Sequence, residues 1–141
     1  MPSSNIAPPA LGKVGAYQVS GKPFVSGAIN VTVGSATAPL EISFPAVTRW
    51  IIIRNLDTDQ SANEEIKIAA SPTGFANGNY FRMFDDYTTS FSRHSRTPRM
   101  EMKLTKIYLT GSSTHVDVIA GLTGIPTDTI PTNWSGSEGV G

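Results

Sequence analysis

The sequence of 141 residues contains no cysteine, which excludes disulfide bonds, a thiolate nucleophile and zinc sites with cysteine ligands. Charged residues are scarce, at 16% against about 25% in a typical soluble domain. Eleven Lys and Arg balance eleven Asp and Glu, so the formal net charge is zero. This balance argues against a protein whose main task is to bind nucleic acid through phosphates. Low charge with no net charge favours association with other chains.

Long apolar runs are also missing. No run approaches the ~18 residues that a membrane-spanning helix needs. Residues 1–12 lack the positive and apolar segments of a secretory signal. We therefore expect a soluble chain, made without a secretion signal and without contact to a membrane. A mass of 15.0 kDa indicates a single domain.

No stretch shows a sustained helical period. Short apolar pieces alternate with turn residues instead, giving roughly nine or ten strands at a spacing of about 8 to 12 residues. Before residue 99 the pieces are 24–28, 29–33, 40–44, 48–55, 65–69, 80–84 and 87–91, and the remaining strands lie in 99–123. The sequence therefore predicts an all-β fold, an antiparallel β-sandwich. A jelly roll suits the strand count better than the immunoglobulin type, whose Cys, Trp, Cys pattern is missing.

The region 99–123 carries the clearest strand pattern. Apolar and polar residues alternate over 100–104, and the alternation changes phase at 105–106, which predicts a β-bulge or a sharp bend. Residues 110–113 are typical of a turn, and 115–120 of a returning strand. The region is therefore predicted to form a β-hairpin.

The run from Trp50 to Ile53 is apolar at every position. Such a strand is expected in the middle of a sheet, with one face in the core and the other covered by an arm, a loop or a neighbouring subunit. We expect it to lie beside the region 99–123.

Both ends of the chain are rich in Pro, Gly and Ser. We divide the chain into an extended N-terminal arm (1–22), a β-sandwich domain (23–123) and an extended C-terminal tail (124–141). The ends cannot bury enough apolar area to offset an ordering cost of ~1 to 2 kcal/mol per residue. We expect them to pack against other chains, with Ile6, Leu11 and Trp134 as anchors; the alternative is that each folds back across its own sandwich.

Catalytic patterns are missing. The two histidines are His94 and His115; we expect His115 to be a surface residue of a strand and not part of a catalytic pair with Asp117, and no serine lies in a G-x-S-x-G turn. We predict that the chain is not an enzyme and binds no cofactor. Residues 57–65 have oxygen ligands at alternate positions but depart from the EF-hand template, and Asp85-Asp86 is explained by turn capping, so we predict no metal site.

The segment 93–99 holds three arginines, Arg93, Arg96 and Arg99. Three arginines this close in sequence can bind phosphate or pair with carboxylates of a neighbouring subunit. No aromatic residue follows Phe91 in this segment, which weakens a single-strand stacking platform. We favour a contact between subunits, or a solvated loop, over nucleic acid.

The phrases RWIIIRNLD (49–57) and KIYLTGSSTHVDVIAGLTGIP (106–126), with a Pro/Ala/Ser arm and a loose tail, resemble small virion structural proteins of tailed bacteriophages. These are jelly-roll or sandwich subunits that decorate, cement or cap a capsid, usually as trimers or rings. The resemblance implies a homo-oligomer, most simply a trimer, that binds the major capsid protein or other virion subunits. It also implies location in the virion, after assembly in the host cytoplasm, and no catalysis.

Two other readings stay open. Vertex, fibre-base and tail proteins share the fold of decoration proteins. A carbohydrate-binding module on the same fold would use exposed aromatic rings as stacking platforms, with Trp50, Tyr80, Tyr87 and Trp134 as candidates. A hydrolase is disfavoured, because no set of acid, base and nucleophile is present.

Overall fold

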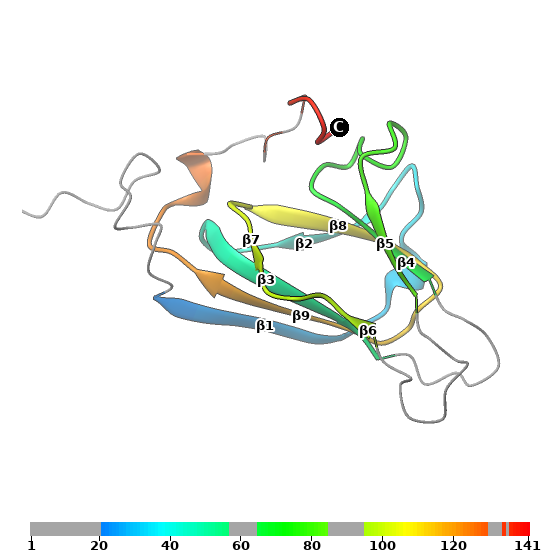
Figure 1. Ribbon diagram of the computed structural model, residues 1–141, viewed down its shortest axis with the longest axis horizontal. Helices are drawn as coiled ribbons and strands as arrows, with labels where there is room; N and C mark the ends of the chain where they lie inside the picture. Colours follow the sequence, from blue (N-terminus) through cyan, green and yellow to red (C-terminus); the bar gives the residue numbers. More distant parts are fainter. Residues whose placement is uncertain (1–20, 57–64, 85–94, 130–133, 135) are drawn as a thin grey trace, which may run out of the picture.

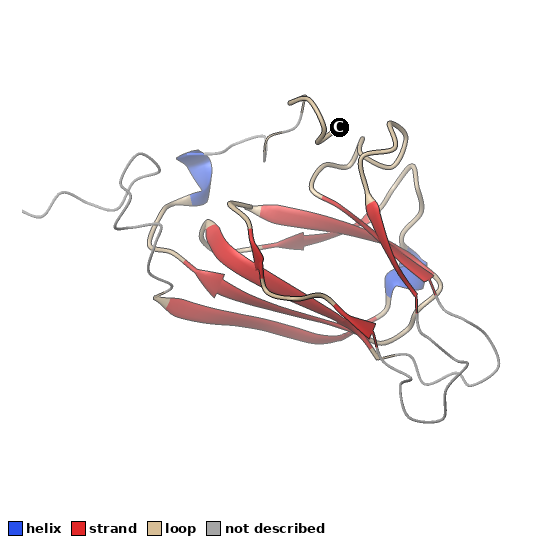
Figure 2. Ribbon diagram, in the orientation of Figure 1, coloured by secondary structure: helices blue, strands red, loops and turns tan. Residues whose placement is uncertain are grey.

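The computed structural model describes residues 21–56, 65–84, 95–129, 134 and 136–141. Two antiparallel sheets pack face to face as a sandwich (Figures 1 and 2). The strands are β1 (Lys22–Ile29), β2 (Leu40–Ser43), β3 (Thr48–Asn55), β4 (Glu65–Ala69), β5 (Phe81–Phe84), β6 (Ser95–Arg96), β7 (Met100–Glu101), β8 (Lys106–Gly111) and β9 (Val116–Leu122). The predicted all-β sandwich is confirmed, with the piece 87–91 outside the described residues.

The order of the strands is that of a jelly roll. Sheet A runs β1-β9-β3-β6, with β7 also on β3, and sheet B runs β2-β8-β4-β5. Since β6 and β7 both pair with β3, they act as one strand interrupted at 97–99. The pairs β1–β9, β2–β8, β3–β6/β7 and β4–β5 are those of one long antiparallel hairpin that has rolled up into two layers.

The apolar run 50–53 lies in β3, at the middle of sheet A. One edge of β3 pairs with β9, where Ile51 lies opposite Ala120, and the other edge pairs with β6 and β7. Ile51 and Ile53 are fully buried between the sheets, while Trp50 and Ile52 point to the outer face and are half-buried. The predicted central strand is confirmed.

The core lies between the two sheets. Phe24 and Phe44 meet edge to face there, with ring centroids 5.0 Å apart. The largest fully buried apolar side chains come from β3, β4, β8 and β9 and from the segments that flank the strands: Val31, Val47, Ile51, Ile53, Ile66, Ile68, Ile107, Leu109, Val116, Val118 and Ile125. Their alternation along the strands positions every other side chain on an outer face.

The predicted hairpin within 99–123 is wrong. β8 pairs with β2 and β4 in sheet B, whereas β9 pairs with β1 and β3 in sheet A. Thr110 and Gly111 end β8, so residues 112–115 connect the two layers. The phase change at 105–106 is not a bulge but the other predicted possibility, a bend, where the chain passes from β7 in sheet A to β8 in sheet B. A local pattern cannot distinguish a turn within a sheet from a turn between sheets, because both need the same residues.

The passage from β7 to β8 is held by Thr48, whose side chain is fully buried. Its hydroxyl donates to the carbonyl of Met102 (2.6 Å) and accepts from the amide of Leu104 (3.0 Å). The amide of Thr48 also donates to the carbonyl of Leu104 (2.9 Å). The crossing segment thus keeps its backbone hydrogen bonds although it leaves the sheet.

The predicted strand over 29–33 divides at Asn30. Its side chain accepts a hydrogen bond from the amide of Thr32 and so caps a short 3₁₀ helix, η1 (Val31–Val33). Asn favours such capping over an extended ladder, because its carbonyl lies within reach of the amide two residues on.

The packed part of the chain extends beyond 123. Ile125 is fully buried, and its carbonyl accepts from the amide of Val47 (3.0 Å). A second 3₁₀ helix, η2 (Thr127–Thr129), follows. Further on, the indole of Trp134 donates to the carbonyl of Lys103 (2.7 Å), so the described part of the tail returns to its own sandwich.

Candidate protein-binding face

The outer face of sheet A carries a row of aliphatic side chains across three strands. Val25 of β1 lies opposite Ile119 of β9, and Ile119 lies opposite Ile52 of β3. Val25 is 69% exposed, and the other two are half-buried. We call these three residues the apolar row. Trp50 extends it in the next position along β3, beside Gly121.

The outer face of sheet B is more polar. Glu41 accepts from the hydroxyl of Ser43 and pairs with Lys106 at 3.0 Å. Thr110 lies opposite Lys67, which carries a further charge on that face. An aromatic cluster covers one end: Ala69, Phe75, Tyr80 and Tyr108.

Phe84 of β5 is the exposed apolar side chain of this face. It lies opposite Glu65, is 52% exposed and has the guanidinium of Arg82 near its ring. Sheet B thus shows one aromatic side chain among charged groups, whereas sheet A shows a continuous aliphatic row, and a continuous exposed apolar patch marks a contact surface.

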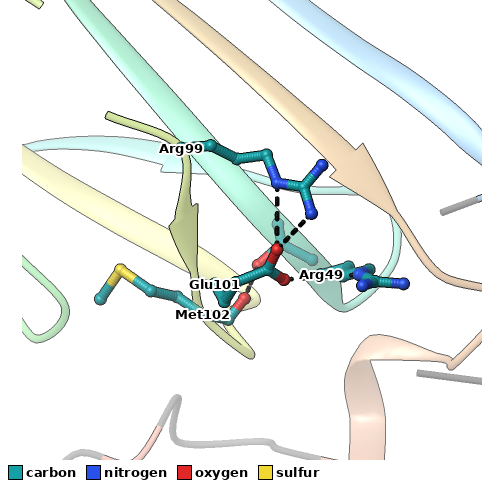
Figure 3. A network of polar contacts seen from close by, with 5 residues as sticks. Arg49, Arg99, Glu101 and Met102 are labelled. Atoms are coloured by element: carbon teal, nitrogen blue, oxygen red, sulfur yellow. Dashed lines mark hydrogen bonds and ion pairs between the residues drawn. The ribbon is translucent and has the colours of Figure 1, made fainter. Parts of the chain in front are cut away.

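A charged group lies at the Trp50 end of the apolar row. Glu101 accepts hydrogen bonds from Arg99 through one carboxylate oxygen, and the other oxygen accepts from Arg49 at 3.4 Å (Figure 3). Hydrogen bonding from Arg99, with a smaller contribution from Arg49, lowers the pKa of Glu101 below its ordinary 4.5. The guanidinium of Arg99 also lies 5.8 Å from the centre of the Trp50 ring.

A second charged group lies on the other side of Ile52 along β3. Arg54 of β3 is 4.0 Å from the carboxylate of Asp117, and Arg96 of β6 lies opposite Arg54. A hollow of about 420 Å³ separates the two groups; it is lined by Ile52, Arg96, Thr97, Pro98 and Arg99. The face therefore combines aliphatic side chains with arginines around a depression.

The structure brings together two of the predicted contact residues. Arg96 and Arg99 both line the hollow, whereas Ile6, Leu11 and Arg93 lie outside the described residues. Trp134 is 39% exposed and bound to Lys103 of its own chain, which is the alternative stated for the tail. Its role toward a partner stays a prediction.

The sequence reading missed Val25 and Ile119. The sequence of β9 does indicate the position of Ile119, because Val118, Ile119 and Ala120 are apolar at consecutive positions, as in β3. That pattern indicates a strand whose two faces both avoid water.

A second hollow, of about 380 Å³, lies near the C-terminus. Tyr80, Phe81, Met102 and Val140 line it together with Asn79. Phe81 is 37% exposed, and Tyr80 carries Lys67 over its ring at 5.3 Å. Such aromatic and amide groups are compatible with a small polar ligand.

The described residues contain no group of three or more metal-binding side chains. His115 is exposed and shares a 2.9 Å hydrogen bond with Thr114. His94, the acidic loop 57–64 and Asp85-Asp86 lie outside the described residues. In the part of the chain that the structure describes, no helix has the length and apolarity to cross a membrane.

Comparisons of the chain with protein-family models, with curated proteins and with solved structures found no match.

Proposed function

We propose that the chain is a structural subunit of a bacteriophage particle, a capsid decoration or cement protein that stabilises the shell through contacts between subunits. The observation that carries this proposal is the difference between the two outer faces of the jelly roll. The outer face of sheet B carries charged groups around one exposed aromatic side chain, Phe84, whereas sheet A presents Val25, Ile119 and Ile52 in one continuous row. Burying such a row contributes roughly 25 cal/mol per Å² of apolar area, which favours a covered face.

The fold alone supports several roles. Jelly rolls occur in viral capsid proteins, lectin domains and other proteins, so function must be argued from the surface. On this proposal the chain forms a homo-oligomer, most simply a trimer, on the major capsid protein or another virion subunit, in the virion assembled in the host cytoplasm. Repetition of one modest contact in a trimer then gives firm attachment through avidity.

Two variants test the role of the face. Ile119→Asp places a carboxylate in the apolar row, and Thr110→Asp makes a comparable change on the outer face of sheet B. Co-sedimentation with capsids should show binding of the wild type, weaker binding of Ile119→Asp and no change for Thr110→Asp. Equal behaviour of the two variants, or a wild type that is monomeric and leaves capsids unbound, argues against the proposal.

A deletion tests the arm. Removal of residues 1–20 should reduce binding to the particle and lower the thermal stability of the capsid, because these residues are proposed to pack on neighbouring subunits. Unchanged binding and unchanged capsid stability would count against a contact through the arm. An image of the native particle separates decoration from vertex, fibre-base and tail roles.

A carbohydrate-binding module is the second candidate. The hollow beside Tyr80, Phe81 and Asn79 supports it, because a ring and an amide together can hold a sugar. A glycan array probed with the wild type and with Tyr80→Ala checks this. If the wild type binds no glycan, this function is excluded. The expectation that the chain is not an enzyme stays a prediction, which a screen for hydrolysis tests.

A further inference from the structure

Two arginines of sheet A face each other across neighbouring strands. Arg54 and Arg96 are direct partners in the register of β3 and β6. Like charges at such positions destabilise a sheet, because their side chains lie on the same face. Asp117 offsets one of them, at 4.0 Å from Arg54, and Arg96 forms no ion pair with any carboxylate among the described residues. In the part of the chain that the structure describes, the pair therefore carries one positive charge more than its carboxylate offsets.

The group on the other side of Ile52 has the same balance. Arg49 and Arg99 share the carboxylate of Glu101. Among the described residues, each of the two groups thus holds two guanidiniums and one carboxylate, although the whole chain has a net charge of zero. The described part of this face therefore carries a positive excess, and a ligand with negative groups at two positions complements it.

The hollow between the two groups presents guanidinium donors to such a ligand. The amide of Thr97 donates to the carbonyl of Ile53 (2.9 Å), and the Thr97 hydroxyl accepts from the amide of Ile53 (3.0 Å). Since these polar groups of Thr97 are used within the sheet, the remaining donors are the guanidiniums of Arg96 and Arg99. The planar guanidinium fits a carboxylate through two parallel hydrogen bonds.

The composition of the face decides between a protein and a nucleic acid as the anionic ligand. The hollow opens beside Ile52, and the apolar row continues through Ile119 to Val25 at the edge strand. A polyphosphate backbone would leave this row uncovered and would meet the carboxylates of Glu101 and Asp117. A protein segment with both aliphatic and acidic side chains covers the row and neutralises the arginines.

We propose that the outer face of sheet A binds a partner protein segment in which aliphatic residues accompany carboxylates, with Arg96 and Arg99 as the carboxylate-binding residues. The inference rests on the proposed role of this face as a contact between subunits and specifies the chemistry of the partner. Arg96 is the more available of the two, because Arg99 already donates to Glu101.

Trp50 provides a reporter for the test. The chain has two tryptophans, so Trp134→Phe leaves Trp50, beside Arg99, as the single emitter. The probes are a short synthetic peptide of alternating valine and glutamate, the same peptide with glutamine in place of glutamate, and a thymidine oligonucleotide. The variants are Arg96→Glu with Arg99→Glu and, as a matched control on sheet B, Lys67→Glu with Arg82→Glu. Circular dichroism checks that each variant is folded.

The glutamate peptide should change Trp50 emission saturably and bind at least about tenfold more tightly than the glutamine peptide. Charge reversal at Arg96 and Arg99 should weaken binding of the glutamate peptide by a similar factor, and the control variant should bind it as the wild type does.

Absence of a saturable change, equal affinity for both peptides, or tighter binding of the oligonucleotide overturns the proposal. Self-association that disappears in the Arg96/Arg99 variant overturns it in favour of a second copy. Sedimentation and capsid binding of Ile119→Asp test the proposed function separately, so the two failures are distinguishable.

Discussion

The hydroxyl of Ser113 donates a 2.6 Å hydrogen bond to the side-chain oxygen of Asn55, and both residues are fully buried. The bond joins the end of β3 to the connection between β8 and β9. The same hydroxyl oxygen accepts from the amide of His115 at 3.3 Å. A turn that crosses from one sheet to the other is thus tied to the central strand by a buried polar pair, which apolar side chains could not direct as specifically.

Removal of this bond should destabilise the fold. Ser113→Ala leaves the Asn55 oxygen without the donor at 2.6 Å, and we expect a loss of about 1 to 3 kcal/mol in the free energy of unfolding. Urea denaturation measures the loss. Ser112→Ala is the control, because Ser112 is exposed and should change stability by less than about 0.5 kcal/mol. Equal effects of the two variants would show that the buried pair is not important.

Thr48→Val tests the passage between the sheets. The variant keeps the shape of the side chain but removes the hydroxyl that contacts Met102 and Leu104, so two buried backbone groups lose a partner. We expect a cost of about 1 to 3 kcal/mol. Thermal unfolding measures it, with Thr110→Val on the outer face of sheet B as the matched control. A Thr48→Val protein as stable as the control contradicts this account.

Gly111→Ala tests the close approach of β8 and β4. Gly111 has a φ of 151°, and a Cβ atom there would lie 2.2 Å from the carbonyl oxygen of Glu65. The strands must move apart to accept it, so we expect a loss of at least about 2 kcal/mol. Gly21→Ala should be nearly neutral, because, its chain neighbours aside, none of the described residues has an atom within 4 Å of its added Cβ. The melting temperatures of the two variants, compared with that of the wild type, measure both effects; equal values would contradict the close approach of β8 and β4.

Stability should fall in acid partly through Glu41. The hydroxyl of Ser43 and the ammonium of Lys106 lower the pKa of Glu41 below its ordinary 4.5. A lowered pKa in the folded state contributes stability that is present above pH 4.5 and is lost as the pH falls through the folded value. The side chains of Glu41 and Lys106 are about 40% exposed, so the contribution is small, under ~1 kcal/mol.

Glu41→Gln should therefore lower stability at neutral pH and leave it unchanged below the folded pKa. Denaturation of both proteins across the acid range measures the difference. The raised pKa of Lys106, which Glu41 causes, predicts the mirror effect in alkali: its contribution is lost as the pH rises through the folded value. A stability difference that is constant across the acid range contradicts the prediction.

Much of the fold was predictable strand by strand. The bounds 48–55 and 65–69 agree with β3 and β4, because turn residues bracket them and aliphatic residues dominate them. The prediction failed where a local pattern has two spatial meanings. The bend predicted at 105–106 is present, but this bend and the connection after Gly111 both lead from one sheet to the other, and neither the residues nor their spacing state which layer the chain enters next.

The contact face was predictable only in part. Arg96 and Arg99 stood out as charges close in sequence, and the run 50–53 indicated a strand covered on both faces. Val25 could not be joined to them, because it lies far away in sequence and reaches Ile52 only through the pairing of both strands with β9.

The amino-acid sequence by itself determined that the chain forms short strands with alternating sides, since side-chain periodicity is a local property. Tertiary structure alone decided which strands are neighbours, and so placed Val25, Ile119 and Ile52 in one row and Arg54 opposite Arg96. The reason is that pairing between distant strands depends on how the whole hairpin rolls up to bury its apolar sides, and no segment of the chain carries that information alone.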